Sequence, residues 1–313
     1  MPEIAILGAG TMGHGIAQVF AAAGWAVRLH DPDPGALAAA PGRIRHNFDP
    51  FLALGLQDAA GVEAALARVA LCPELETACQ GAAVVMECAP ERLDLKRAIF
   101  ARAEAAAGPQ ALLCSNTSAL PISDIGRDLA DPARLVGVHF WNPPHIVPCV
   151  EIVAGRATSP AAYERAAEMV EAAGKVAVRV RKEVPGFLGN RLQHALQREA
   201  LYLVEAGIAA PEDVDKVVKH GFGLRYALMG PLERADLGGL DVTYAVQGTV
   251  LPDLDNRTQP SPLLAQRVAA GQLGVKTGQG FYQWTPERRQ RLVAQRDLAL
   301  LSIIKLVEDL QKA

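Results

Sequence analysis

The stretch at residues 3–31, EIAILGAGTMGHGIAQVFAAAGWAVRLHD, indicates how the first half of the chain folds. Its apolar start, EIAIL, predicts a strand, and TMGHGIAQVFAAAG predicts a helix that ends at Gly24. The next residues, WAVRLHD, predict a second strand that ends at Asp31. A strand, a helix and a strand in this order are typical of a parallel sheet covered by helices.

Three glycines at the first strand–helix junction, Gly8, Gly10 and Gly13, form the pattern GxGxxG. Such glycines permit a tight turn, a close approach of backbone to a pyrophosphate, and packing of the helix on the strand. Asp31 is positioned to bind ribose hydroxyls and to repel a 2′-phosphate, which favours NAD over NADP. A glycine-rich turn without a ligand would not explain this context. We therefore expect NAD to bind at these four residues and at the loop residues Thr11 and Met12.

Strands and helices continue to alternate up to residue 182. Helices are predicted through residues 50–70 and over DLKRAIFARAEAAAG, which ends at Gly108. Further strands are predicted at residues 82–87, 111–115, 135–140, 150–153 and 175–182. Residues 1–182 are therefore predicted to form a Rossmann-type domain of the α/β class, with a doubly wound, mostly parallel sheet.

From Glu183 onward, apolar residues recur at helical spacing, beginning with FLGNRLQHALQREALYLVEAG. Further helices are predicted over PEDVDKVVKHG, PLERADLGGLDVTYAVQ and SPLLAQRVAAG. A last helix is predicted to start at Thr285, with Pro286 in its first turn. We predict that residues 183–313 form an all-α domain that completes the substrate cleft and makes a homodimer contact.

The composition narrows the class of protein. The chain has 313 residues, 50% of them hydrophobic, and a net charge of -3, which gives no positive field for nucleic acid or an anionic membrane. Five cysteines lack CxxC spacing, so we expect buried thiols rather than disulfides or a metal site. No secretory signal or long apolar run is apparent, and we expect a cytoplasmic protein.

His139 and Glu151 are the candidate catalytic residues. His139 lies at the end of the predicted strand RLVGVHF, and Glu151 follows twelve residues later in PCVEIV. A histidine can take a proton from a hydroxyl near neutral pH, and a carboxylate on its other nitrogen would stabilise the imidazolium. Spacing alone does not show that the two side chains meet, so a structural histidine and an exposed glutamate remain the simpler interpretation.

Several motifs taken together resemble the L-3-hydroxyacyl-CoA dehydrogenase family over nearly the whole chain: GAGTMGHGIA, SNTSALPIS, VGVHFWNPP, VEIV and VPGFLGNR. The resemblance implies an NAD-dependent oxidoreductase, often of fatty acid metabolism, that interconverts a 3-hydroxyacyl-CoA or related 3-hydroxy acid and its 3-keto product. It implies that His139 and Glu151 form the catalytic dyad. It also implies that Ser118 and Asn190 orient the substrate oxygen.

The resemblance further implies that Glu91 and Lys96 line the nicotinamide and cofactor cleft. Other interpretations of the matched residues stay open. Glu91 and Lys96 open a helix and could be solvated. Ser118 could stabilise a turn, and Asn190 could make a local hydrogen bond.

The segments NPPHIVPCVEIV and GFGLRYALMGPLE are more similar to the branch of the family that contains lambda-crystallin, an L-gulonate 3-dehydrogenase. Arg225, in GLRYA, is of interest because a guanidinium can hold a carboxylate with two parallel hydrogen bonds. We hypothesise that Arg225 binds the carboxylate of a small free hydroxy acid similar to L-gulonate or carnitine. A structural ion pair or a dimer contact would explain Arg225 equally well. The C-terminal VKTGQGFYQW instead resembles hydroxybutyryl-CoA enzymes.

Two other classes of protein share part of this pattern. Hydroxyacid dehydrogenases similar to the 6-phosphogluconate enzyme carry a catalytic lysine on the interdomain helix, and GFLGNRLQHALQ has none. A non-catalytic NAD-binding protein, structural or sensory, would not need both His139 and Glu151.

Overall fold

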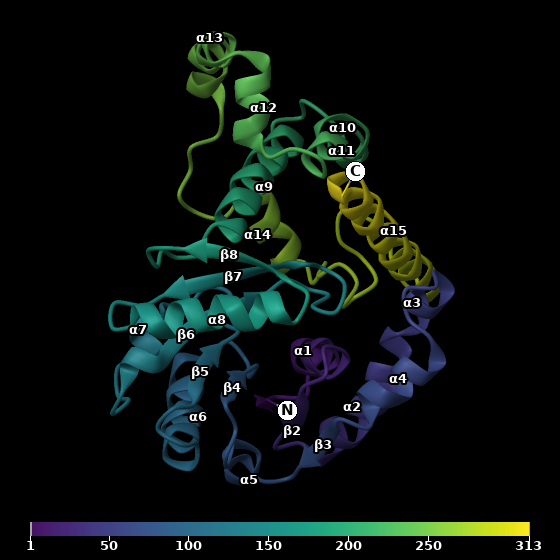
Figure 1. The fold of residues 1–313 in the computed structure, drawn as a ribbon. Helices are drawn as coiled ribbons and strands as arrows, with labels where there is room; N and C mark the ends of the chain where they lie inside the picture. Colours follow the sequence, from purple (N-terminus) through teal and green to yellow (C-terminus); the bar gives the residue numbers. More distant parts are fainter. Residues whose placement is uncertain (1, 313) are drawn as a thin grey trace. The chain divides into compact units, whose positions relative to one another are not determined.

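The computed structural model describes residues 2–312, which form two compact units that meet between Arg191 and Leu192. The first unit contains the sheet, whose strands follow the order β3-β2-β1-β4-β5-β6-β7-β8 in the described residues (Figure 1). The strands are β1 Glu3–Leu7, β2 Ala26–His30, β3 Val69–Cys72, β4 Val84–Glu87, β5 Leu112–Ser115, β6 Leu135–Phe140, β7 Cys149–Ala154 and β8 Val176–Val180.

Strands β3 to β6 of this order pair in parallel, whereas β7 pairs antiparallel with β6 and parallel with β8. The carboxyl ends of β1, β4, β5 and β6 therefore lie at one edge of the sheet, together with the start of β7. This edge is where a doubly wound sheet binds its ligands. The predicted fold, a Rossmann-type α/β domain followed by a helical domain, is confirmed.

Helices cover both faces of the sheet (Figure 1). One face packs against α1, α2, α4 and α8, and the other against α5, α6 and α7. The helices of this unit are α1 Thr11–Ala22, α2 Pro34–Asn47, α3 Asp49–Ala53, α4 Ala59–Leu66, α5 Leu75–Cys79, α6 Leu93–Ala106, α7 Ile122–Ile125 and α8 Pro160–Ala172, with a 3₁₀ turn at Pro132–Arg134.

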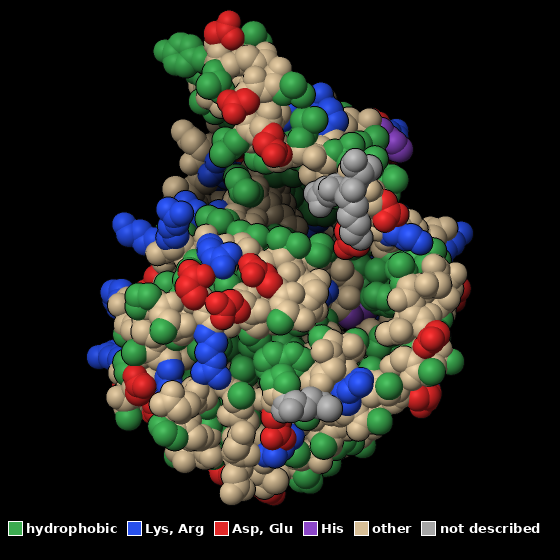
Figure 2. Space-filling model, in the orientation of Figure 1, with side chains coloured by type: hydrophobic (Ala, Val, Ile, Leu, Met, Phe, Trp, Pro, Cys, Tyr) green, Lys and Arg blue, Asp and Glu red, His purple; other side chains and the backbone are tan. Residues whose placement is uncertain are grey.

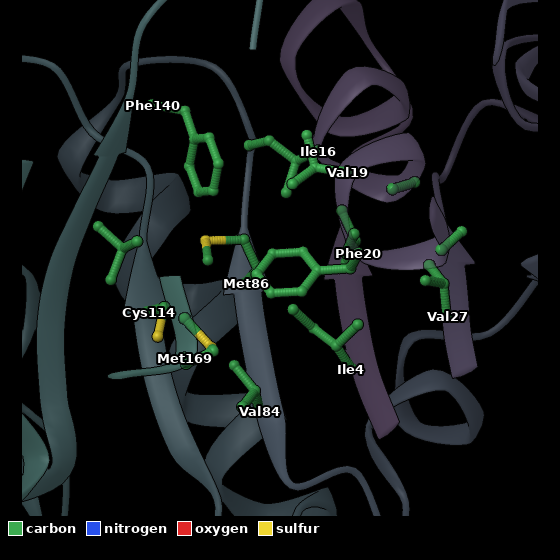
Figure 3. Close-up of a cluster of buried hydrophobic side chains, with 14 of the residues drawn as sticks. Ile4, Ile16, Val19, Phe20, Val27, Val84, Met86, Cys114, Phe140 and Met169 are labelled. Atoms are coloured by element: carbon green, nitrogen blue, oxygen red, sulfur yellow. The ribbon is translucent and has the colours of Figure 1, made fainter. Parts of the chain in front are cut away.

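The hydrophobic core is divided between the two faces because successive strand residues point to opposite sides. Ile4 and Ile6 of β1 belong to one buried cluster, and Ala5 and Leu7 belong to the other. Figure 3 shows the ring of Phe20 from α1 lying over the first of these faces, beside Ile4 and Met86. This packing fixes α1, and with it the glycine-rich loop, on the sheet.

The second unit is helical. Its helices are α9 Gly189–Glu205, which starts within the first unit, α10 Pro211–Val217, α11 Gly223–Tyr226, α12 Pro231–Gly238, α13 Leu240–Val250, α14 Pro262–Ala269 and α15 Pro286–Lys312, with a π-helical turn at Val218–Phe222 and a 3₁₀ turn at Leu251–Asp253. Across residues 2–312, none of the helices has the length and apolarity needed to span a membrane.

Three local predictions were wrong or incomplete. Residues 231–247 form two helices instead of one, since Gly239 has a φ of 91° and ends the first of them. The sequence up to residue 70 was expected to be helical, but Val69 starts β3, which pairs with β2. Helix α2 was not predicted, because it contains Pro41 and two glycines.

Candidate active site

The glycine-rich loop connects β1 to α1 at the ligand-binding edge. Gly8 has a φ of 111°, and a Cβ on Gly13 would lie 1.7 Å from the carbonyl oxygen of Gly8. The turn and the close packing of α1 on the strand therefore explain two of the three glycines. A Cβ on Gly10, however, would meet nothing within 4 Å. The chain's own packing does not require this glycine, whereas a pyrophosphate that approaches the backbone would.

The surroundings of the loop also fit a dinucleotide. Gly10 is the N-cap of α1 and offers no side-chain cap, so the first N–H groups of the helix are available to phosphate oxygens. Asp31 follows β2, and its carboxylate accepts hydrogen bonds from the backbone N–H of Ala9 at 2.6 Å and of Asp33 at 2.9 Å. Arg43 of α2, which the sequence analysis missed, donates to the carbonyl of Ala9 at 2.8 Å. The Ala9 peptide is thus held on both sides.

His139 and Glu151 meet through the pairing of β6 with β7. The antiparallel register places them directly opposite each other, and His139 Nδ1 lies 2.8 Å from Glu151 Oε2. Their residues are 7% and 1% exposed, so the hydrogen bond lies in a medium of low polarity. The strand register thus brings together two residues that sequence spacing could not connect.

The second oxygen of Glu151 is held by the backbone. Its Oε1 accepts hydrogen bonds from the N–H groups of Leu188 at 2.8 Å and Gly189 at 3.0 Å. Burial alone would raise the pKa of Glu151, but the bonds from His139 and these two N–H groups outweigh burial. Its pKa therefore lies below the usual value. Glu151 is poised to stay ionised behind the imidazole.

The segment that supplies these N–H groups has an unusual backbone. Phe187 adopts a φ of 51°, a left-handed conformation that is rare for a residue other than glycine. Its buried ring lies 5.8 Å from the imidazole of His139, and the ring of Trp141 lies 5.9 Å from it. A Cβ on Gly189 would lie 1.9 Å from the Trp141 ring, so only glycine fits there. The two aromatic rings restrict the orientation of His139.

Ser118 and Asn190 are also brought together. The Asn190 side-chain amide donates to the backbone carbonyl of Ser118 at 3.0 Å, not to its hydroxyl. Asn116, two residues before Ser118, accepts a hydrogen bond from the N–H of Phe140 at 2.8 Å and so ties the loop to the end of β6. Residues 116–119, called the Ser118 loop below, therefore lie beside the end of β6, the strand that carries His139.

Lys96 is buried, whereas Glu91 is exposed but is held in place by several hydrogen bonds. Glu91 Oε1 accepts hydrogen bonds from Thr117 Oγ1 at 2.6 Å and from the N–H groups of Ser118 and Ala119, both at 3.0 Å. Burial would raise the pKa of Glu91, but these bonds and the Lys96 cation outweigh it, so the pKa lies below its usual value. Lys96 is 1% exposed.

Arg225 lies on α11 of the helical unit and is exposed. In the part of the chain that the structure describes, its guanidinium forms no hydrogen bond or ion pair. An ion pair with another described residue therefore does not explain Arg225. Among residues 2–312 there is no group of three histidine, cysteine or acidic side chains that could hold a metal ion.

In this structure a Rossmann-type sheet carries a glycine-rich loop and a buried base at the same edge. This arrangement is expected of an oxidoreductase that uses a nicotinamide dinucleotide. Comparison with known proteins agrees with this class. Residues 3–184 match the NAD binding domain of 3-hydroxyacyl-CoA dehydrogenase, and residues 186–284 match the C-terminal domain of the same family. The chain belongs to the 3-hydroxyacyl-CoA dehydrogenase family, as its motifs predicted, and its cofactor is NAD.

Individual relatives differ in substrate. The chain is 34% identical to a 5-formyl-3-hydroxy-2-methylpyridine 4-carboxylate 5-dehydrogenase of Mesorhizobium japonicum, over 98% of both sequences. A crystal structure with this activity, described as an NAD+ dependent dismutase, superimposes with a TM-score of 0.92 over 98% of this chain and 99% of that one, at 34% identity.

Two further relatives complete the range of substrates. An L-carnitine dehydrogenase of Streptomyces coelicolor is 41% identical over 76% of this chain and 73% of its own. The crystal structure of (S)-3-hydroxybutyryl-CoA dehydrogenase from Ralstonia eutropha is 31% identical, with a TM-score of 0.76 over 91% of this chain and 99% of that one.

Proposed function

We propose that the protein uses NAD to oxidise the hydroxyl-bearing carbon of a small free hydroxy acid, or to reduce the matching carbonyl compound. The observation that supports this chemistry is the buried hydrogen bond of 2.8 Å between His139 and Glu151 at the edge of the sheet where the glycine-rich loop lies. A base at that edge is what the oxidation of an alcohol requires.

The hydrogen bond fixes the role of each nitrogen of His139. Because Nδ1 donates to the ionised Glu151, the neutral imidazole carries its lone pair on Nε2, which is free to accept the hydroxyl proton. The imidazolium that forms is stabilised by the carboxylate behind it. When bound, NAD accepts the hydride from the carbon that bears this hydroxyl group. Ser118 and Asn190 are assigned to orient the substrate oxygen.

Two observations favour a free carboxylate over a thioester. The relative that matches over 98% of both sequences and the carnitine dehydrogenase are both named for substrates that carry a carboxylate. Arg225 is an exposed guanidinium with no partner in the described residues, and a carboxylate is its best match in geometry and charge.

A panel of substrates tests the proposed function directly. NAD reduction would be compared for L-carnitine, L-gulonate, free 3-hydroxybutyrate, 3-hydroxybutyryl-CoA and 5-formyl-3-hydroxy-2-methylpyridine 4-carboxylate, whose formyl group would be oxidised as its hydrate. We expect the largest kcat/KM for one of the free acids. Preference for the thioester would support the second candidate, a 3-hydroxyacyl-CoA dehydrogenase, which the match to the hydroxybutyryl-CoA enzyme favours. Binding of NADH without turnover of any compound would indicate a non-catalytic NAD-binding protein.

Replacement of Arg225 tests the role of the carboxylate. In Arg225→Leu we expect the KM for the preferred acid to rise about 10²-fold, since a bidentate charged contact is lost, while kcat changes less. Arg291→Leu, at an exposed arginine of α15, is the matched control. Equal KM values in the two variants would rule out a contact between Arg225 and the substrate.

We also propose that the protein is a homodimer. Helices α12 and α13 expose large apolar side chains, and hydrophobic side chains are visible on this segment at the top of Figure 2. Leu232, Leu237 and Tyr244 are 81%, 78% and 83% exposed. A patch of this kind is typical of a surface that another protein covers. Sedimentation of the wild-type protein and of Leu237→Asp would test this assignment, with a shift to monomer expected in the variant.

A further inference from the structure

Three charged residues, Glu87, Lys96 and Glu91, are linked by contacts to the Ser118 loop and are separate from the His139–Glu151 pair. Glu87, the last residue of β4, is 0% exposed, and its Oε1 lies 2.7 Å from the ammonium nitrogen of Lys96. Oε1 also accepts a hydrogen bond from the N–H of Ala89 at 2.6 Å, and Oε2 accepts one from Ser115 Oγ at 2.6 Å. Each oxygen of Glu87 therefore has a partner, which a buried carboxylate needs.

Lys96 connects this carboxylate to a second one. Its Nζ lies 3.4 Å from Glu91 Oε2 and also donates to the carbonyl of Ala89 at 3.2 Å. In the described residues, Lys96 is the cation that pairs with Glu91. The other oxygen of Glu91 accepts the hydrogen bonds from Thr117, Ser118 and Ala119. A continuous chain of contacts thus runs from Glu87 to the loop that carries Ser118.

The two distances show which carboxylate holds the Lys96 ammonium group more closely. Lys96 is nearer to Glu87, at 2.7 Å, than to Glu91, at 3.4 Å. While Glu87 holds the ammonium group, Glu91 keeps Oε1 free to accept the four bonds from the loop, two of them from Ser118. Without the charge on Glu87, the buried ammonium would be drawn to the remaining carboxylate, because an ion with no partner in a site of low polarity is costly.

We propose that Glu87 is a positioning residue for catalysis: by holding Lys96, it fixes the Glu91 carboxylate and, through Glu91, the loop on which Ser118 stands. The catalytic part of the proposal rests on the role assigned to Ser118 under the proposed function. The part that concerns the loop does not, because the contacts of Glu87, Lys96 and Glu91 exist without a substrate.

The test is the nearly isosteric variant Glu87→Gln, examined by amide hydrogen exchange and by steady-state kinetics. We expect the N–H groups of Ser118 and Ala119 to exchange about 10-fold faster, because they lose their fixed acceptor. We expect kcat to fall about 10-fold, since the serine is no longer held in one position.

Glu104→Gln is the matched control. Glu104 of α6 is also a mostly buried glutamate that accepts two backbone hydrogen bonds, from Ala130 at 2.8 Å and Asp131 at 3.0 Å, and it pairs with Arg134. Its contacts lie away from the Ser118 loop. This variant should lose thermal stability but keep the wild-type kcat and the wild-type exchange at Ser118 and Ala119.

The double variant Glu87→Gln/Lys96→Met removes both charges of the buried pair and guards against a failure of the single variant to fold. It should also show faster exchange and a lower kcat, because Glu91 then lacks the Lys96 ammonium that fixes its Oε2. The proposal is overturned if exchange at Ser118 and Ala119 and the value of kcat match those of Glu104→Gln, or if exchange rises while kcat is unchanged. Exchange needs no substrate, so an inactive wild-type protein would refute the proposed function while exchange still tests the loop.

Discussion

Two carboxylates in the first unit hold their neighbours by different means. Glu151 belongs to a strand, and its partner His139 lies directly opposite on the next strand. Glu91 belongs to a loop, and it binds the backbone and hydroxyl groups of another loop, at Thr117 to Ala119. Both have a lowered pKa, because in each case hydrogen bonds to the ionised form outweigh burial.

The difference concerns what each carboxylate touches. Glu151 contacts the side chain that is proposed to move the proton, whereas Glu91 contacts the backbone around a residue that is proposed to orient the substrate. A substitution at Glu151 should therefore slow the proton transfer itself. A substitution at Glu91 should only loosen the position of Ser118, and it should lower kcat less.

The largest effect is expected at the imidazole. His139→Gln should lower kcat about 10³-fold, because no other group replaces the general base. NADH binding should be retained, as measured by fluorescence titration, since the glycine-rich loop is untouched. A variant that turned over substrate at a rate close to that of the wild type would remove His139 from the mechanism.

A smaller loss is expected when the partner of the imidazole changes. In Glu151→Gln the amide can donate to Nδ1, which favours the tautomer that carries its proton on Nε2 and cannot accept another there. We expect kcat to fall about 10²-fold, measured with the preferred acid. If the loss at Glu151 were no greater than at Glu91, the distinction between the two carboxylates would be wrong.

The loop carboxylate should show the smallest loss of rate. Glu91→Gln keeps one oxygen for the loop but loses the attraction to Lys96, so we expect kcat to fall only about 10-fold. The measurement is kcat beside that of Glu151→Gln under the same conditions. A fall as large as that of His139→Gln would instead show that Glu91 takes part in the chemistry.

Stability should show the least change. Folding lowers the pKa of Glu151, so its ionised form stabilises the protein above the pKa of an unfolded glutamate, and this contribution is lost as pH falls through the folded pKa. At pH 7, Glu151→Gln should cost about 1 kcal/mol in urea unfolding. The difference from wild type should shrink below about pH 4. A difference that grows on acidification would contradict the lowered pKa.

Local patterns predicted the parts of the molecule that depend on neighbouring residues. The glycine-rich loop and its flanking strand and helix could be identified because each element has its own short signal. The hydrogen bond between His139 and Glu151 could not, because it depends on which residues of two antiparallel strands lie opposite each other. Resemblance to a family, and not spacing, linked these two residues before the structure did.

Other features gave little or no signal. Glu87 ends the apolar run VVME and looks like the end of a strand, and nothing in the sequence indicates that it pairs with Lys96. Leu188 and Gly189 lie in the motif VPGFLGNR, but that pattern does not indicate that their N–H groups bind Glu151. Helix α2 forms despite Pro41 since Leu37, Ala40 and Ile44 pack into the core, where burial outweighs propensity.

The pairing of β6 with β7 has a consequence for how this site can change over time. Strands align only in whole-residue steps, and a slip of one step would turn Glu151 to the opposite face of the sheet. The separation of acid and base therefore cannot drift by small amounts. The connection between the two strands begins at Trp141, whose ring lies 5.9 Å from that of His139, so this segment can change only in ways that keep the ring in place.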